Sequence, residues 1–329
     1  MRAMLLQKPG GEGEALSLVD IARPEPGPGD VLVEVAYCGC NFADTMMRKG
    51  TYPHPKGYPI VAGLEIAGRV VALGPDVTTL AIGDRVAAFS EEAGGFADFC
   101  TVPAERCVVL PEAIGFDTGA AFLVQGLTAW HMLHTVSTTK PGDTLLVHAI
   151  GGGVGLYLTQ LGVLAGARVI GTIGTAGKEK RPLDYGAALV VNRAERDFVA
   201  AIEEFAGKDG IDKIVDSTGA TILDQSFALI RKLGHIVSYG EAEGKPFPNL
   251  WERLVRKSLT FTRFHLGHSN FQSPEWRAGA AFVTGAIADG SLAVPIEAVF
   301  PFAEVGAMYD RLESRTVSGK LLLAVQPGL

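Results

Sequence analysis

The chain has 329 residues, more than one compact core usually holds, and this length predicts two domains. Hydrophobic residues make up 47% and charged residues 20%, which is typical of a packed globular protein and excludes a disordered chain. A formal net charge of −7 argues against nucleic acid as the main partner. No apolar run reaches the roughly 18 residues that span a bilayer, and the N-terminus lacks a secretory signal, so we expect a cytoplasmic protein without a membrane partner.

The first third of the chain has the pattern of a β-rich domain. Short apolar runs are separated by glycine and proline, as in Gly74-Pro75-Asp76. The predicted strands are Val31–Tyr37, Gly68–Leu73, Ile82–Phe89 and a short one from Val102 onward. Strands of this length and spacing predict an irregular antiparallel barrel.

The cysteines do not have the spacing of a zinc site. There are four, namely Cys38, Cys40, Cys100 and Cys107. Cys38 and Cys40 are two residues apart, so on a strand they point to one face, unlike the cysteines of a zinc knuckle. We expect free thiols in a reducing compartment.

From about Leu123 the chain alternates between apolar strands and helices. The predicted strands are Thr144–Ala149, Arg168–Thr172, Lys213–Asp216 and His235–Ser238. The predicted helices are Val154–Ala165, Asp197–Gly207 and Ile222–Lys232. This alternation predicts an α/β fold with a doubly wound parallel sheet, the Rossmann fold.

The pattern changes again near His268. A helix is predicted over Glu275–Asp289 and a closing strand over Lys320–Val325. The simplest arrangement returns this strand to the first domain. The predicted domains are therefore residues 1–123 with 269–329, and residues 124–268 between them.

The strongest local signal is a glycine turn that joins the first Rossmann strand to its helix. The sequence Leu145–Gly155 reads LLVHAIGGGVG and contains His148, Gly152, Gly153 and Val154. Glycine lets the backbone approach a pyrophosphate, and the helix N-terminus stabilises its charge. Ile150 stands where the GxGxxG fingerprint has its first glycine, and an ordinary tight turn is the alternative interpretation. The strand–helix–strand context favours a dinucleotide site.

The second Rossmann strand distinguishes between the two nicotinamide cofactors. An NAD enzyme places Asp or Glu about 20 residues beyond the glycine turn, where the carboxylate holds the ribose 2′-hydroxyl. The segment Gly171–Gly177 contains no acid, and Thr175, Lys178 and Arg193 lie in or after it. A hydroxyl and two cations suit a 2′-phosphate, so we expect NADPH.

An ordered set of motifs resembles the medium-chain dehydrogenase/reductase superfamily, and within it the zinc-free quinone oxidoreductases related to zeta-crystallin. The resemblance covers essentially the whole chain. The motifs are Cys38–Asp44 (CGCNFAD), Gly63–Val70 (GLEIAGRV), Gln125–Ala129 (QGLTA), His148–Gly155 (HAIGGGVG), Val215–Gly219 (VDSTG) and Ser258–Arg263 (SLTFTR). The resemblance implies a GroES-like catalytic domain beside the Rossmann domain.

Two positions in these motifs imply chemistry without a metal. Zinc-dependent cousins carry a cysteine ligand where Asn41 stands and a histidine ligand where Leu64 stands. An amide and an isobutyl group are not zinc ligands. Without a Lewis acid, the suitable hydride acceptor is one that is already activated, such as a quinone or a conjugated carbonyl. Reduction of an enoyl or alkenal double bond is an alternative, and the sequence does not distinguish it from reduction of a quinone.

The resemblance also implies roles for individual residues. Asn41, Tyr52 and Arg263 are the catalytic candidates, with Asn41 also near the nicotinamide ribose. Arg315 is a candidate for the phosphate end, and Thr128, His148 and Ser217 are expected to contact the cofactor. Family members often have an aromatic residue where Arg193 stands and a proline where Phe264 stands. These departures change residues that are expected to bind the 2′-phosphate and to line the acceptor pocket.

Two expectations concern the protein as a whole. We expect a homodimer that acts on a small-molecule acceptor. The alternative from another class is a non-catalytic NADPH-binding protein with a structural or RNA-binding role. The acidic charge balance and the lack of a basic cluster beside exposed aromatic residues count against it.

Overall fold

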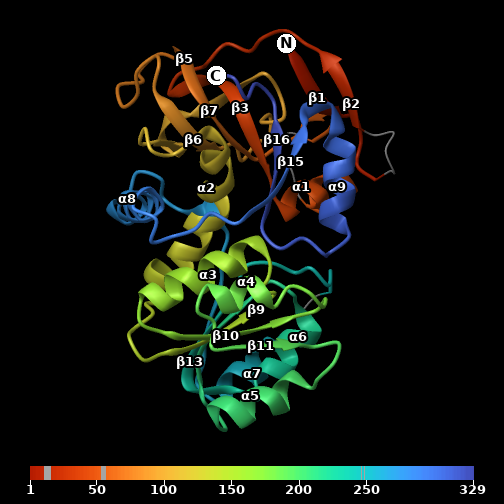
Figure 1. Cartoon of the computed structure of the whole chain (residues 1–329), viewed down its shortest axis with the longest axis vertical. Helices are drawn as coiled ribbons and strands as arrows, with labels where there is room; N and C mark the ends of the chain where they lie inside the picture. Colours follow the sequence, from red (N-terminus) through yellow and green to blue (C-terminus); the bar gives the residue numbers. More distant parts are fainter. Residues whose placement is uncertain (11–15, 53–56, 246, 248) are drawn as a thin grey trace. The chain divides into compact units, whose positions relative to one another are not determined.

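The computed structural model describes residues 1–10, 16–52, 57–245, 247 and 249–329. It separates into two compact units, Met1–Val124 with Asn270–Leu329, and Gln125–Ser269 (Figure 1). The boundaries lie one residue beyond those expected from the sequence. No sheet is shared between the units, and each unit has its own hydrophobic core.

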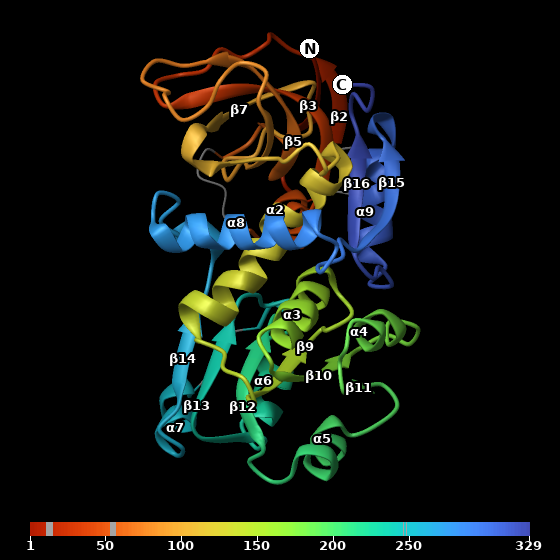
Figure 2. The ribbon, with the colours of Figure 1, turned by 60° about the vertical axis from the view of Figure 1, so that its left-hand side comes forward.

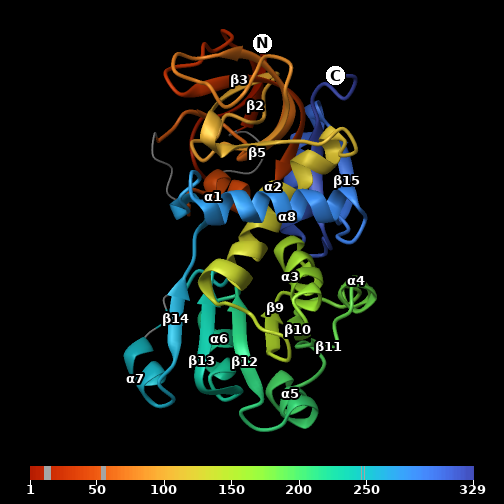
Figure 3. The same cartoon turned by 90° about the vertical axis from the view of Figure 1, so that its left-hand side faces the viewer.

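The second unit is built on a six-stranded parallel sheet. Its strands, in spatial order, are β11 (Leu189–Asn192), β10 (Arg168–Ile173), β9 (Thr144–His148), β12 (Ile211–Asp216), β13 (Ile230–Ser238) and β14 (Thr260–Arg263). Figure 3 shows the strands side by side in this order. All five residues of β9 are buried, as expected for a central parallel strand. The predicted doubly wound fold is confirmed.

Helices join the strands of this sheet. They are the end of α2 (Phe116–His131) with a π-helical turn at Met132–Val136, then α3 (Gly153–Leu164), α4 (Lys180–Asp184), α5 (Phe198–Ala206), α6 (Ala220–Ser226) and α7 (Leu250–Val255). A 3-10 turn follows β14 at Leu266–His268. Asp197 caps α5, because its carboxylate accepts from Val199 N at 2.9 Å and Ala200 N at 3.3 Å.

The helix predicted over Ile222–Lys232 is wrong in its second half. Helix α6 ends at Ser226, and β13 begins at Ile230, which pairs with Ile211 of β12. Ile230 is fully buried, and its side chain packs in the core of the sheet and not on one face of a longer helix. Pairing with a distant strand therefore overrides the local helical pattern.

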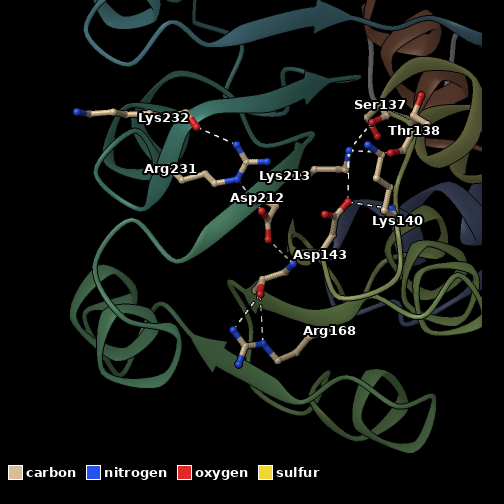
Figure 4. A network of polar contacts seen from close by, with 10 residues as sticks. Ser137, Thr138, Lys140, Asp143, Arg168, Asp212, Lys213, Arg231 and Lys232 are labelled. Atoms are coloured by element: carbon tan, nitrogen blue, oxygen red, sulfur yellow. Dashed lines mark hydrogen bonds and ion pairs between the residues drawn. The ribbon is translucent and has the colours of Figure 1, made fainter.

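A polar network ties the loop after α2 to the amino ends of the parallel strands (Figure 4). Buried Lys213 donates to the carbonyl oxygens of Ser137 and Thr138, the latter at 3.1 Å, and lies 3.5 Å from Asp143. Asp212 accepts from Thr144 N at 2.7 Å. The network closes the end of the sheet opposite to the glycine turn.

The first unit contains two sheets. The larger has the order β15 (Ile296–Pro301), β16 (Lys320–Ala324), β3 (Asp30–Cys40), β5 (Glu65–Leu73), β6 (Arg85–Phe89) and β8 (Cys107–Val109), with β7 (Phe99–Pro103) also paired to β3. The smaller has the order β2 (Leu16–Asp20), β1 (Arg2–Leu6) and β4 (Ile60–Val61). All pairs are antiparallel except β15 with β16. This mixed, irregular arrangement confirms the expected GroES-like fold class.

The first unit also contains helices α1 (Phe42–Lys49), α8 (Pro274–Ala288) and α9 (Val305–Glu313), with 3-10 turns at Ala104–Arg106 and Phe302–Glu304. Figure 2 shows α8 and α9. Strand β16 pairs antiparallel with β3, with Leu321 opposite Cys40 and Leu323 opposite Cys38. The last strand of the chain thus lies beside one of the first. Within the described residues, no helix is long and apolar enough to cross a membrane.

All four cysteines are free thiols. Cys38, Cys40 and Cys100 belong to the hydrophobic core of the first unit. Burial raises the pKa of Cys100 to about 11, which keeps this thiol protonated and unreactive at neutral pH.

Candidate cofactor and active site

The glycine turn runs from the end of β9 into α3. Gly152 is the N-cap of α3, and its N–H donates to Ala149 O at 2.9 Å. A Cβ on Gly155 would lie 2.6 Å from the carbonyl oxygens of Ala149 and Ile150. A Cβ on Gly151 would lie 2.8 Å from Lys178 O. Glycine is therefore required at both positions for the turn to close.

Ile150 is accommodated in place of the first glycine of the fingerprint because its side chain points into the sheet. It is fully buried, and its N–H donates to Thr172 O at 3.1 Å. A Cβ on Gly171 of the neighbouring strand would lie 2.6 Å from Ile150 Cδ1. The Ile150 side chain thus packs in the core beside Gly171 and does not lie on the outer side of the turn.

The turn lies where the strand order of the sheet reverses. From β9 the chain proceeds outward through β10 and β11, then returns to the other side of β9 at β12. Ligands of doubly wound sheets bind at this switch point, beyond the carboxyl ends of the strands. The N-terminus of the 12-residue helix α3 supplies partial positive charge there.

The carboxyl end of β10 carries the cationic residues. The Arg193 backbone N–H donates to Ile173 O at 2.9 Å, and its Nε donates to the same oxygen at 3.3 Å. Among the described residues, Arg193 Nη1 is buried and has no hydrogen-bond partner. Its Nη2 lies 3.0 Å from where a Cβ on Gly174 would be, and burial lowers the pKa of Arg193. Thr175 and Lys178 are half-buried on the segment that follows.

This arrangement fits the 2′-phosphate of NADPH. A buried guanidinium nitrogen without a partner costs free energy, which an anionic oxygen would offset. The neighbouring Gly174 has no side chain that would obstruct such an anion. The structure brings Arg193, Thr175 and Lys178 to the same end of β10, and their expected contact with the 2′-phosphate stays a prediction.

His148 lies in the core of the sheet rather than on the surface of the turn. It is fully buried, with Nδ1 2.8 Å from Thr172 Oγ1 and Nε2 2.8 Å from Ser226 Oγ. The Ser226 hydroxyl donates to Ile222 O at 2.6 Å, so it accepts from Nε2–H, and Nδ1 accepts from Thr172. Burial lowers the pKa of His148 to about 3, and the ring is therefore neutral.

Ser217 and Thr128 flank the switch point from two elements. Ser217 follows β12 and is half-buried, next to Asp216, whose carboxylate accepts from Thr218 N at 3.1 Å and Gly219 N at 3.0 Å. Thr128 is buried on α2. One turn earlier on α2, Gln125 Oε1 lies 2.2 Å from where a Cβ on Gly153 would be, and no described residue donates to it.

Arg263 ends β14 and is exposed. Its Nη1 donates to Ser238 O at 3.2 Å, and its Nε lies 3.3 Å from Glu241 Oε1. The ion pair holds the guanidinium at the carboxyl end of the sheet, the same end that carries the glycine turn. Its assignment as a catalytic residue stays a prediction.

Asn41 lies in the first unit, where β3 ends and α1 begins. It is the N-cap of α1, and its backbone N–H donates to Asp44 Oδ2 at 2.8 Å. Burial raises the pKa of Asp44 to about 7. The Asn41 side chain, 6% exposed, accepts from Lys320 Nζ at 2.7 Å and donates to Glu65 Oε2 at 3.0 Å.

Sequence reasoning did not identify Glu65 or Lys320 as part of this group. Glu65 lies in the motif Gly63–Val70, and a carboxylate in a strand of mostly apolar residues indicates that it has a buried partner. Lys320 starts the last strand, where the sequence gives no sign of its burial. Both residues are fully buried and form an ion pair.

Tyr52 and Arg315 also belong to the first unit. Tyr52 is half-buried and follows α1, with its backbone N–H 3.3 Å from Met46 O. The residues directly after it, 53–56, lie outside the described part of the chain. Arg315 is exposed, follows α9 and has a φ of 60°. The roles expected for both residues stay predictions.

The parallel sheet, its glycine turn and the cationic end of β10 define a dinucleotide-dependent dehydrogenase or reductase. In the part of the chain that the structure describes, no group of three or more His, Cys, Asp or Glu side chains is arranged to hold a metal ion.

Comparison with known proteins gives the same class. Residues 27–112 match the alcohol dehydrogenase GroES-like domain, and residues 153–284 match the zinc-binding dehydrogenase domain. The chain is 32% identical to 2-haloacrylate reductase from Burkholderia sp, over 99% of both chains. It is 33% identical to the quinone oxidoreductase of Salmonella typhimurium, covering 95% of this chain and 96% of that protein.

A solved structure of Escherichia coli quinone oxidoreductase complexed with NADPH matches with a TM-score of 0.92 and 31% identity, covering 99% of this chain and 100% of the other. The chain belongs to the quinone oxidoreductase family of the medium-chain dehydrogenase/reductase superfamily. The predicted zeta-crystallin-like branch and the expectation of a quinone oxidoreductase-like enzyme are thereby confirmed.

Proposed function

We propose that this protein transfers hydride from NADPH to a quinone or a related conjugated carbonyl, without a metal. The observation that carries the proposal is the carboxyl end of β10, where buried Arg193 Nη1 has no partner among the described residues. The segment Gly171–Gly177 next to this cation contains no acid that would hold a ribose 2′-hydroxyl. The complex of the Escherichia coli relative with NADPH supports the same cofactor.

The residues of the second unit have distinct parts in holding NADPH. Gly153 and Val154 present the first N–H groups of α3 to the pyrophosphate, and Gly152, the N-cap, lets the backbone approach it without a side chain. Arg193, Thr175 and Lys178 hold the 2′-phosphate through charge-assisted hydrogen bonds. Bound NADPH supplies the hydride, so the protein contributes orientation, exclusion of water and a proton donor.

The class of acceptor is inferred from the residues at the two former zinc-ligand positions and from the remaining hydrogen-bond donors. Asn41 and Leu64 stand where zinc ligands stand in related enzymes, and Leu64 is buried at 4% exposure. An acceptor that needs no Lewis acid, such as a quinone or enone, suits these residues. Tyr52 and Asn41 are the proposed donors to the oxygen that gains charge as hydride arrives.

Reduction of an activated carbon–carbon double bond is the second candidate function. The relative from Burkholderia, which matches over 99% of both chains, is named 2-haloacrylate reductase. A 2-haloacrylate has a double bond conjugated to a carboxylate, and hydride addition to it again places negative charge on oxygen. The same cofactor site and the same donors serve both reactions.

A panel of acceptors tests the proposal. Purified protein is mixed with NADPH and, separately, with a benzoquinone, a naphthoquinone, an enone, an alkenal, an enoyl thioester and 2-chloroacrylate, and the absorbance of NADPH is followed. We expect turnover with the quinones, the enone or both, and much slower turnover with NADH. Absence of turnover with every acceptor would refute the proposal, and calorimetry with NADPH would then show whether the cofactor assignment fails as well.

We also propose that the protein is a cytoplasmic homodimer. Strand β14 is the last in the order of the parallel sheet, so it presents an edge for pairing. On the preceding α7, Trp251 is 77% exposed and Val255 is 60% exposed. Four free thiols are in keeping with a reducing compartment. Light scattering during size-exclusion chromatography should give twice the chain mass, and a monomer would refute the dimer.

A further inference from the structure

Three side chains from distant parts of the first unit meet at Asn41. Lys320 comes from β16, Glu65 from β5, and Asn41 from the junction of β3 with α1. Lys320 Nζ donates to Asn41 Oδ1 at 2.7 Å and also to Glu65 Oε2. Lys320 and Glu65 are fully buried, so solvent does not screen the pair.

The chemistry of the three groups fixes which way the Asn41 amide points. An ammonium only donates, so it faces the amide oxygen. A carboxylate only accepts, so Glu65 Oε2 faces Asn41 Nδ2, at 3.0 Å. A flipped amide would place NH₂ against the ammonium and oxygen against the carboxylate. Both contacts would be repulsive in a buried, weakly screened place, so only one orientation is stable.

The surroundings of the pair are also specific. The second carboxylate oxygen of Glu65 accepts from Val124 N at 2.9 Å, which holds the carboxylate from the opposite side. A Cβ on Gly39 would lie 2.6 Å from Lys320 Cε and 2.1 Å from Ala120 O. Glycine at position 39 is therefore what admits the lysine stem next to β3.

We propose that Lys320 and Glu65 are positioning residues, which hold the Asn41 amide in one orientation at the start of α1 so that it can act on the cofactor or the acceptor. The inference rests on the proposed function in one respect, namely that Asn41 contacts the reacting groups. The fixed orientation of the amide does not depend on the proposed function, because it follows from the contacts of Asn41 with Lys320 and Glu65.

The network also sets the position of α1. The Asn41 backbone N–H donates to Asp44, so the residue that Lys320 orients is also the one that starts the helix. Residues 51 and 52 both donate from their backbone N–H groups to Met46 O in the same helix, at 2.9 and 3.3 Å. Through Asn41, the C-terminal strand is thereby linked to the start of α1, which also binds the Tyr52 backbone.

The test uses paired neutralising substitutions, because removing one charge would leave the other buried and would destabilise the fold. In the double variant Glu65→Gln/Lys320→Met, Gln keeps an acceptor for Val124 N and Met keeps most of the lysine volume. Lys213→Met is the matched control, because it removes a buried ammonium from the second unit without contacting Asn41.

The first measurement is the side-chain amide signal of Asn41 in protein labelled with ¹⁵N-asparagine, assigned by its absence in Asn41→Asp. In the wild type and in Lys213→Met, we expect two resolved N–H signals that exchange slowly with solvent. In the double variant, we expect shifted signals with at least about ten-fold faster exchange, since the lost contacts release the amide. Unchanged Asn41 signals in the folded double variant would overturn the inference.

The second measurement is kinetic, with the acceptor that the wild type reduces fastest. We expect kcat of the double variant to fall by about ten-fold or more, because misplacement by about 1 Å can cost 10²-fold, while the Kd for NADPH changes by less than about three-fold. An equal fall in Lys213→Met would mean a general effect of stability and would overturn the positioning role. If the wild type reduces no acceptor, the proposed function fails, and the amide signals alone decide the orientation.

Discussion

The guanidinium of Arg193 lies at the end of β10, held by Ile173 O through both its backbone N–H and its Nε. Lys178 follows the same segment and is half-buried, and its ammonium is a compact point charge without the planar fork of a guanidinium. A guanidinium that is held in place, with a buried Nη1, loses less entropy on binding a phosphate than an ammonium on a four-carbon stem does. Arg193 is therefore expected to dominate the 2′-phosphate grip.

Calorimetry with NADPH and NADH tests this expectation. The wild type should bind NADPH at least about ten-fold more tightly than NADH, a difference of roughly 1.4 kcal/mol. Arg193→Ala should remove most of that preference and leave the affinity for NADH nearly unchanged, and Lys178→Ala should have a smaller effect of the same sign. Equal affinity of the wild type for both cofactors would contradict the NADPH assignment.

Tyr52 is the residue for which the choice of acceptor matters most. A phenol near the developing oxyanion donates a hydrogen bond, and loss of such a donor typically costs about 10²–10³ in rate when it is essential. We expect Tyr52→Phe to lose much more activity with an enone than with a quinone, since solvent can protonate the reduced quinone. Affinity for NADPH should change little. If Tyr52→Phe reduces each acceptor at the rate of the wild type, Tyr52 is a packing residue and not a proton donor.

His148 makes the stability of the second unit depend on pH. The pKa of His148 in the folded state is lowered to about 3 by burial, below the ordinary value near 6.5. Between these values the unfolded chain binds the proton and the folded chain does not, so stability falls as pH decreases from about 6.5. One such proton changes the unfolding free energy by about 1.4 kcal/mol per pH unit.

Urea unfolding at pH 7 and pH 5, monitored on the second unit, measures that slope. In His148→Gln we expect a lower stability at pH 7, because two buried hydrogen bonds change, together with a weaker dependence on pH. A variant that keeps the full slope of the wild type would show that other groups account for it.

At the scale of elements, the β9–α3 turn depends on two glycines to different degrees. A Cβ on Gly155 would lie 2.6 Å from two backbone carbonyl oxygens, whereas one on Gly152 would lie 3.3 Å from Ala149 O. We expect Gly155→Ala to destabilise the second unit by about 1–3 kcal/mol, because the backbone must shift. Gly152→Ala should cost about 1 kcal/mol, because alanine is a poorer N-cap than glycine but its Cβ is less obstructed than one on Gly155. Thermal unfolding of the two variants gives the comparison.

Elements that carry their own periodic signal could be predicted from the sequence. Helix α3 was expected over Val154–Ala165 and spans Gly153–Leu164, because its boundaries follow from the glycine turn. The α6–β13 boundary was not predictable, since residues near Ile230 have an apolar pattern that suits either element. Only the pairing of Ile230 with Ile211, which depends on the whole sheet, decides between them.

The candidate site divides in the same way. The glycine turn and the cations of the β10 segment are local in sequence, so their common location could be predicted. The partners of Asn41 are not local, because Lys320 is 279 residues away and lies on a strand whose neighbour was not known. A buried lysine beside a buried glutamate leaves no periodic trace in either segment, and only the pairing of β16 with β3 brings them together.

At the scale of the whole molecule, the same lysine bears on metal binding. Its ammonium lies 2.7 Å from Asn41 Oδ1, so a divalent cation bound to this oxygen would meet a fixed positive charge in a weakly screened place. We expect purified protein to contain far less than one zinc per chain, and treatment with a chelator to leave turnover intact. Elemental analysis that finds one zinc per chain, with activity lost on its removal, would refute metal-independent catalysis.

The pairing of β16 with β3 also has a consequence for how the chain is made. A ribosome releases the chain from its N-terminus, so all of Gln125–Ser269 emerges before Lys320 does. The Rossmann unit has every strand it needs by then, while the barrel still lacks the strand that lies along β3 and the cation that neutralises Glu65. The discontinuous unit must therefore finish folding after the continuous one, because β16, which pairs with β3, is synthesised after Ser269. A ribosome that stalls just before codon 320 would leave a folded cofactor unit joined to an unfinished barrel, a species suited for recognition by chaperones and proteases.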